Sequence, residues 1–181
     1  MRKVRSAIAL VMVFPMLFSL TACSKSVKEY DKESFLAVLK DDLKIEDDDI
    51  YETEVDEHNG VGDGVVVAAR HGHAMITVQF CDDAADAKKA FDKDYESFLD
   101  TFNKNDQFKG DYIAEQTSNG GYIVIKGSAP ETDIFGDRNR TGDVYGGYYC
   151  SGSMIMLVMS QSADDFDDVG EIISALGLPN V

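Results

Sequence analysis

Two of the three histidines stand one residue apart, at His71 and His73 within the stretch RHGH of residues 70–73. Imidazole nitrogens bind zinc, but a structural zinc site needs four protein ligands and a catalytic site needs three. His58 is the third histidine, so carboxylates would have to complete such a site. The same stretch separates two apolar runs, where a histidine and a glycine suit a tight turn. We therefore predict a turn at His71, no bound metal and no cofactor.

Cys81 is a second candidate for chemistry, because it stands just before a predicted helix, where the helix dipole lowers the pKa of a thiol. With a histidine of the preceding hairpin it would form a Cys–His nucleophile. Asp82 and Asp83 directly follow the sulfur, and their negative charges disfavour a thiolate. No peptidase signature surrounds Cys81, so we predict that it is not catalytic.

Cys81 and Cys150 are the two cysteines that follow Cys23, and both fall at the ends of predicted strands. In an oxidising compartment such a pair can form a disulfide, provided that the Cα atoms lie within about 7 Å of each other. Two separate buried thiols account for the same residues equally well. The sequence leaves both alternatives open.

Three tyrosines lie close together in residues 144–150, VYGGYYC. Aromatic residues on a strand can anchor a partner, although they also pack in cores. We predict Tyr145, Tyr148 and Tyr149 as partner-binding residues, together with the long polar segment 128–143.

The remaining pattern predicts the elements that position these residues. Helical periodicity follows Asp31, a predicted N-cap, and recurs over about 83–102 and 163–176. Paired apolar runs that flank turn residues predict three hairpins, with residues 51–55 as an added edge strand; the runs are 64–70 with 74–80, 111–116 with 121–127 across Asn119-Gly120, and 144–150 with 154–160. We predict an α+β fold of two layers, an antiparallel sheet of hairpins with helices packed on one face, formed by residues 31–181 as a single domain.

The predicted strand at 154–160, MIMLVMS, is apolar on both of its faces. One explanation is a central strand that is covered on both sides, and the other is an exposed, methionine-rich binding surface. Because apolar runs usually indicate burial, we favour the central strand.

The first residues have the layout of a secretory signal. Arg2, Lys3 and Arg5 precede an apolar run at 7–20, which is shorter than the roughly 20 residues that cross a bilayer. The run closes with Leu-Thr-Ala-Cys at residues 20–23, which resembles the lipobox of bacterial lipoproteins. That resemblance implies lipid attachment to the Cys23 sulfur, cleavage before Cys23, and a signal peptide at residues 1–22. Residues 23–30 are then expected to form the lipidated cysteine and a tether.

The charge of the chain limits its partners. The chain has 17 basic and 33 acidic residues, and three of the basic ones fall in residues 1–22, which leaves 14 against 33. Such an acidic domain is unsuited to nucleic acid, which needs a basic surface. We predict a lipid-anchored protein on the extracytoplasmic side of the cell membrane that binds a basic protein or a cell-wall component and is not an enzyme. The alternative is an enzyme that acts on envelope material through Cys81 or a His71/His73 metal site.

Overall fold

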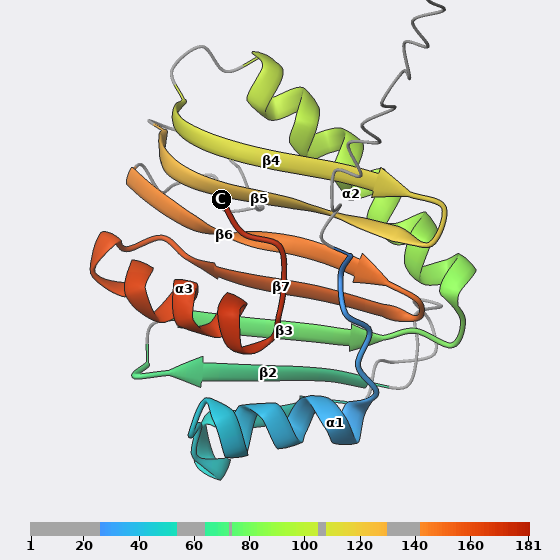
Figure 1. Cartoon of the computed structure of the whole chain (residues 1–181), viewed down its shortest axis with the longest axis vertical. Coiled ribbons are helices and arrows are strands. Elements are labelled where there is room, and N and C mark those ends of the chain that lie inside the picture. The colour runs from blue at the N-terminus through green and yellow to red at the C-terminus, as the bar shows by residue number, and fades with distance from the viewer. Residues whose placement is uncertain (1–25, 54–63, 73, 105–107, 130–141) are drawn as a thin grey trace, which may run out of the picture.

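The computed structural model of the chain describes residues 26–53, 64–72, 74–104, 108–129 and 142–181 (Figure 1). Its helical elements are α1 (Lys32–Ala37), η1 (Val38–Asp42), η2 (Asp47–Asp49), α2 (Ala84–Lys104), η4 (Ala163–Asp165) and α3 (Phe166–Ala175). Its strands are β1 (Ile50–Thr53), β2 (Gly64–Arg70), β3 (Ala74–Phe80), β4 (Lys109–Thr117), β5 (Gly120–Ala129), β6 (Gly142–Ser151) and β7 (Met154–Ser160).

The described strands form one antiparallel sheet in the order β1-β2-β3-β7-β6-β5-β4. The three predicted hairpins are confirmed as β2–β3, β4–β5 and β6–β7, and β1 is the predicted edge strand. His71 and Gly72, which lie in the turn between the paired residues Arg70 and Ala74, have left-handed φ angles of 50° and 75°, as is common in tight hairpins. The turn of β4–β5 is Ser118–Asn119, one residue earlier than predicted.

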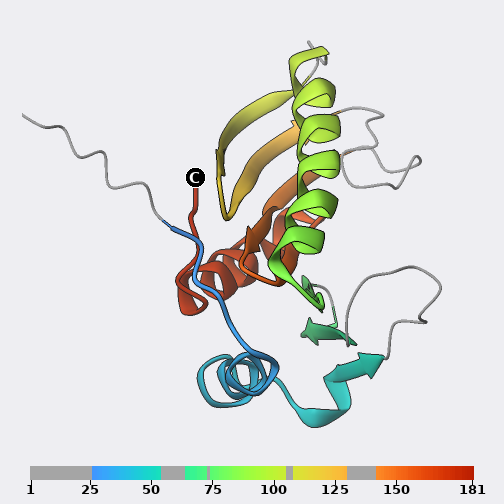
Figure 2. The same ribbon diagram turned by 90° about the vertical axis from the view of Figure 1, so that its right-hand side faces the viewer.

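The three predicted helices are also confirmed, and they pack against both faces of the sheet (Figure 2). We call the face that carries α1 and α3 the front face, and the face that carries α2 the back face. The α+β fold built on an antiparallel sheet with packed helices is as predicted, whereas the placement of every helix on one face is corrected. The reason is that the central strands are apolar on both faces, and each face needs a cover.

Strand β7 lies in the middle of the sheet, which confirms it as a central strand and excludes the exposed methionine surface. Its residues alternate between the two cores. The front-facing set is Met154, Met156 and Val158, and the back-facing set is Ile155, Leu157 and Met159.

The two ends of the sheet differ in what lies beside them. At the end that we call proximal, residues 26–31 meet the turns Ser118–Asn119 and Gly152–Ser153. The backbone nitrogen of Gly152 donates to the oxygen of Asn119 at 3.3 Å, which joins these two turns. At the distal end lie the His71–Gly72 turn and the first residues of β4 and β6. The seven residues of β3 separate the two ends by about 20 Å.

Residues 27–30, which the sequence predicted as part of a tether at 23–30, pack against the domain, whereas residues 23–25 lie outside the described residues. Tyr30 is buried, and its hydroxyl donates to the backbone oxygen of Leu176 at 2.8 Å. Val27 packs against the same core. Glu29 accepts a hydrogen bond of 3.1 Å from the backbone nitrogen of Ser153. The domain therefore starts before residue 31, because Tyr30 and Val27 supply apolar cover for the front core.

Candidate binding pocket

The described residues give the histidine pair no metal-binding geometry. His71 lies exposed in the β2–β3 turn, and its Nδ1 is 3.2 Å from a carboxylate oxygen of Asp168. Among the residues that the structure describes, no three His, Cys, Asp or Glu side chains are grouped so that they could hold a metal ion. His73 and His58 lie outside the described residues.

Cys81 and His71 are at opposite ends of β3, which rules out the predicted alternative of a Cys–His nucleophile formed by these two side chains. Cys81 directly follows the strand and His71 precedes it, so about 20 Å separates them. Burial raises the pKa of the Cys81 thiol, and the nearby carboxylates of Asp86, Asp82 and Asp83 raise it further. A thiolate is therefore disfavoured at Cys81.

Cys81 and Cys150 are both free and buried, so the disulfide alternative is wrong and the alternative of two buried thiols holds. They share the back core beneath α2, but β7 lies between them. Cys150 on β6 is paired with Ile155 on β7, and Cys81 follows β3 on the other side of β7. Burial raises the pKa of Cys150 to about 12.

The three predicted partner-binding tyrosines serve the interior instead. Tyr145, Tyr148 and Tyr149 are all buried, with at most 9% of any of them exposed. Their hydroxyls donate to groups of the same chain, namely the Asn180 side-chain oxygen at 2.7 Å from Tyr145, the Asp94 carboxylate at 3.0 Å from Tyr148, and the Pro179 backbone oxygen at 3.1 Å from Tyr149. The prediction failed because β6 is a central strand with helices on both faces. Residues 130–141 of the predicted contact loop lie outside the described residues.

A pocket of about 250 Å³ opens on the front face at the proximal end, where none of the described helices covers β4 and β5. Residues from four segments line it, among them Ser26, Val27, Glu115, Thr117, Asn119 and Tyr122. The segment 26–31 thus forms one wall of the pocket, and the β4–β5 hairpin forms another. Its volume is below the roughly 300–1,000 Å³ of pockets for drug-sized ligands, so it suits a small group.

Glu115 and Tyr122 give the pocket its polar character. They face each other across the β4–β5 pair, and the Tyr122 hydroxyl donates to Glu115 Oε2 at 3.0 Å. Burial raises the pKa of Tyr122, and the hydrogen bond to Glu115 and the charge of that carboxylate add to the shift. Within the described part of the chain, Glu115 has no cationic partner, so it can accept hydrogen bonds from an amine or a hydroxyl group.

In the described part of the chain, the pocket holds one carboxylate, Glu115, beside the hydroxyls of Thr117 and Tyr122. Its described lining contains no histidine or lysine that could act as a general base for the Thr117 or Tyr122 hydroxyl. The sequence did not predict Glu115 and Tyr122 as site residues, because each is a common residue type in an exposed or half-buried strand. The hairpin register is the one signal that could have brought them together.

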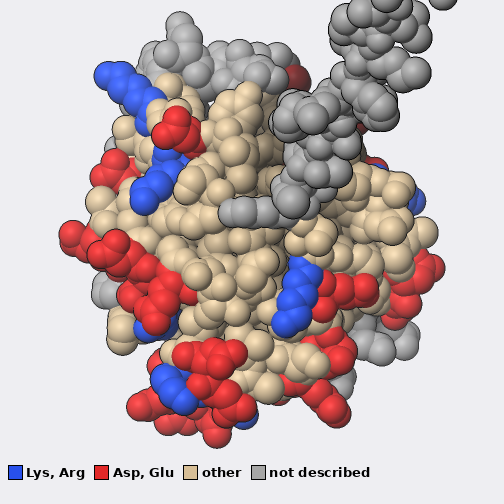
Figure 3. All heavy atoms as spheres, viewed as in Figure 1, with Lys and Arg blue, Asp and Glu red and all other residues tan. Residues whose placement is uncertain are grey.

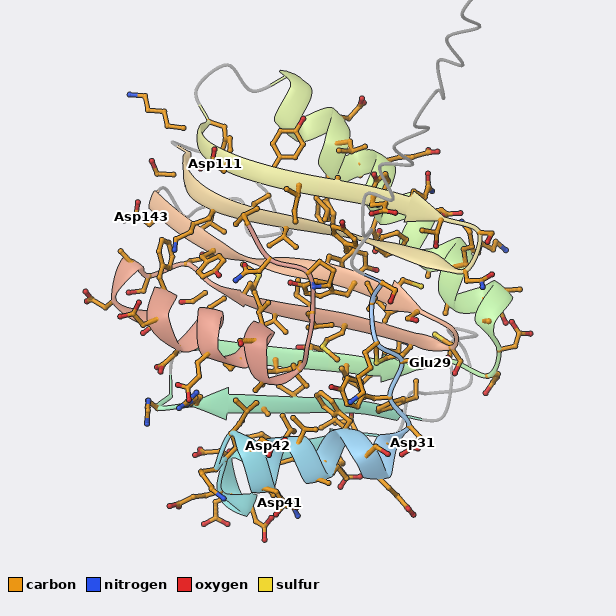
Figure 4. The ribbon with its side chains drawn as sticks, viewed as in Figure 1. Glu29, Asp31, Asp41, Asp42, Asp111 and Asp143 are labelled. Atoms are coloured by element: carbon orange, nitrogen blue, oxygen red, sulfur yellow. The ribbon has the colours of Figure 1, made fainter. Side chains whose placement is uncertain are left out.

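The distal end carries a second polar feature, which we call the distal acidic surface. Its members are exposed and come from η1, β4, β6, η4 and the start of α3; they are Asp41, Asp42, Asp111, Asp143, Asp164 and Asp167. Figure 4 places Asp111 and Asp143 at one end of the strands and Glu29 near the other. Figure 3 shows acidic side chains gathered over α3 and around α1. Lys126 lies beside this surface, with its Nζ 4.5 Å from the centre of the Tyr145 ring.

No described helix is both long enough and apolar enough to cross a bilayer. Comparison of the chain with protein-family models, with curated proteins and with solved structures found no match.

Proposed function

We propose that this chain is a lipid-anchored protein on the extracytoplasmic side of the cell membrane that acts by binding a partner and not by catalysis. Residues 1–22 serve as its signal peptide, and the Cys23 sulfur carries the lipid. Two acyl chains give a stable anchor, because each buried methylene contributes about 0.8 kcal/mol and a single chain binds only marginally.

The packing of residues 27–30 against the domain is the observation that supports a lipid anchor at Cys23. Val27 and Tyr30 pack in the front core, only a few positions after Cys23. The sequence changes from the lipobox to a core-forming segment with almost no linker. That arrangement suits a protein that functions close to a membrane surface.

The large distance between the candidate catalytic residues favours a binding function over the enzymatic alternative. Cys81 is buried at one end of β3, whereas His71 lies at the other end, and the described pocket lining contains no histidine or lysine. Catalysis by a nucleophile requires that it lie within hydrogen-bond reach of its base. Cys81 and His71 do not meet this condition.

The partner that the charge favours is a basic protein or a basic cell-wall component. The distal acidic surface presents six exposed carboxylates from five elements. An acidic surface attracts basic partners. This attraction weakens as the salt concentration rises, because the Debye length falls to about 10 Å at 0.1 M.

Cross-linking of the anchored protein in cells, with mass spectrometry of the captured partners, tests this proposal. The variant Asp41→Asn, Asp111→Asn, Asp143→Asn should reduce capture of basic partners and flatten the salt dependence of binding. The control Asp82→Asn, Asp86→Asn, Glu96→Gln changes the net charge equally on exposed residues of the α2 region and should bind as the wild type does. Equal loss in both variants, or loss in neither, would contradict the distal surface as the contact.

A further inference from the structure

We propose that the proximal end of the sheet lies against the lipid bilayer, and that the short link to Cys23 sets this orientation. The inference rests on the proposed lipid attachment at Cys23 and goes beyond it, because attachment alone does not say which end of the domain meets the lipid. The occupant of this surface is the bilayer itself, through its headgroups.

The length of the link carries the argument. Cys23 stands three positions before Ser26, which lines the pocket beside Thr117 and Asn119. Three residues span at most about 10 Å even when fully extended. The sheet is about 20 Å long between its ends. A lipid on Cys23 can therefore bring the proximal end to the membrane, while the distal end stays out of reach of the same link.

The contacts of residues 27–30 keep the link short. Tyr30 is held by its hydrogen bond to Leu176 and by burial, and Glu29 is held by the backbone nitrogen of Ser153. Lengthening the link would require Val27 and Tyr30 to leave the core and expose apolar surface, at roughly 25 cal/mol for each Å². The domain thus stays close to its anchor as long as it is folded.

The side chains at the proximal end suit contact with headgroups. Ser118, Asn119 and Ser153 supply hydroxyl and amide groups at the two turns. Lys28 lies at the exit of the link, with its Nζ 4.3 Å from the centre of the Tyr30 ring. A lysine side chain is attracted to an anionic membrane surface. Asp82 and Asp83 also follow β3 at this end, so the orientation depends on the link more than on charge attraction.

Photo-crosslinking at two matched turns tests the orientation. Benzoylphenylalanine replaces either Asn119 or His71, which are exposed residues in hairpin turns at the proximal and distal ends. The lipidated full-length protein is reconstituted in vesicles of phosphatidylcholine and phosphatidylglycerol, irradiated and analysed by mass spectrometry. We expect several-fold more lipid adducts from position 119 than from position 71. Equal or reversed yields would overturn the inference, and so would adducts from position 119 to a second copy in place of lipid.

A variant with a longer link between Cys23 and the domain tests whether the short link causes the orientation. A flexible insert of 20 Gly and Ser residues after Ser24 has a root-mean-square length of about 25 Å, comparable to the sheet. It should remove most of the difference between the two positions, and an unchanged difference would contradict the link as the cause. Intact mass measured on the same samples separates the two proposals. A protein without lipid refutes the proposed anchor, whereas a lipidated protein with equal adduct yields refutes the orientation alone.

Discussion

The hydroxyl of Tyr30 donates a 2.8 Å hydrogen bond to the backbone oxygen of Leu176, which joins the first described segment to the end of α3. The last carbonyls of a helix lack partners within the helix, so this bond satisfies a group that would otherwise need water. Both residues are buried on the front face. The start and the end of the described chain are thus held in one core.

Removal of the Tyr30 side chain should destabilise the whole domain. Tyr30→Phe should lower the free energy of unfolding by about 1 kcal/mol, the typical contribution of one hydrogen bond. Tyr30→Ala should lower it by about 3–5 kcal/mol, because it also leaves a cavity. Urea denaturation measures both values. Tyr51→Phe is the control, since Tyr51 is 60% exposed, and it should stay within about 0.5 kcal/mol of the wild type. A Tyr30→Ala variant as stable as the wild type would mean that residues 27–30 are not part of the core.

Substitution of Gly152 should cost more than the same substitution at Gly72. Both glycines lie in hairpin turns with left-handed φ angles, 55° and 75°, so alanine costs about 1–2 kcal/mol at either position. A Cβ at Gly152 would in addition overlap the Glu29 carboxylate, whereas nothing lies within 4 Å of one at Gly72. The loss of the bond from Ser153 to Glu29 should add about 1 kcal/mol. Equal melting temperatures for the two variants would contradict the contact of the Glu29 carboxylate with the Gly152–Ser153 turn.

The two thiols should be unreactive in the folded protein. Burial raises the pKa of both Cys81 and Cys150, to about 12 for Cys150, so neither is a thiolate at neutral pH. Iodoacetamide labelling near pH 8, followed by mass spectrometry, should modify both cysteines only after urea is added. Rapid modification of native Cys81 would restore it as a candidate nucleophile.

The contacts of Asp92, which join α2 to β4, should stabilise the domain less in acid than at neutral pH. Burial acts to raise the pKa of Asp92, but hydrogen bonds from Lys88 and Gln116 outweigh it and hold the pKa below its usual 3.8. A lowered pKa stabilises the fold above the usual value, and the contribution disappears as the pH falls below that value. Asp92→Asn should therefore cost less than about 1 kcal/mol near neutral pH, because the side chain is partly exposed.

Urea midpoints of the wild type and of Asp92→Asn, measured near pH 7 and near pH 3, give the comparison. The difference between the two proteins should be smaller at the lower pH. A difference that grows in acid would contradict the sign of the pKa shift.

The periodic patterns predicted most of the fold. Apolar stripes at helical spacing placed α2 and α3, and alternating runs around turn residues placed three hairpins, because these signals are local. The distribution of helices over two faces depends on which strands are central, and that is decided by the pairing of β3 with β7. Strand order is a non-local property that the hairpins alone do not specify.

The same limit explains the errors at the candidate sites. The sequence alone does not show that helices cover both faces of β6. Without that information, an exposed contact surface is a reasonable prediction for Tyr145, Tyr148 and Tyr149. A two-residue turn at Asn119-Gly120 would place Glu115 opposite Val124, but the observed turn at Ser118–Asn119 places it opposite Tyr122. A shift of one residue in the turn therefore hid the pair that defines the pocket.

The intact mass of the protein made in a bacterial cell tests the central proposal most directly. We predict a chain that begins at Cys23 and carries a diacylglyceryl group on its sulfur, and we expect Cys23→Ala to yield a soluble or unprocessed chain without lipid. An unmodified chain that begins at any other residue would contradict the lipid anchor.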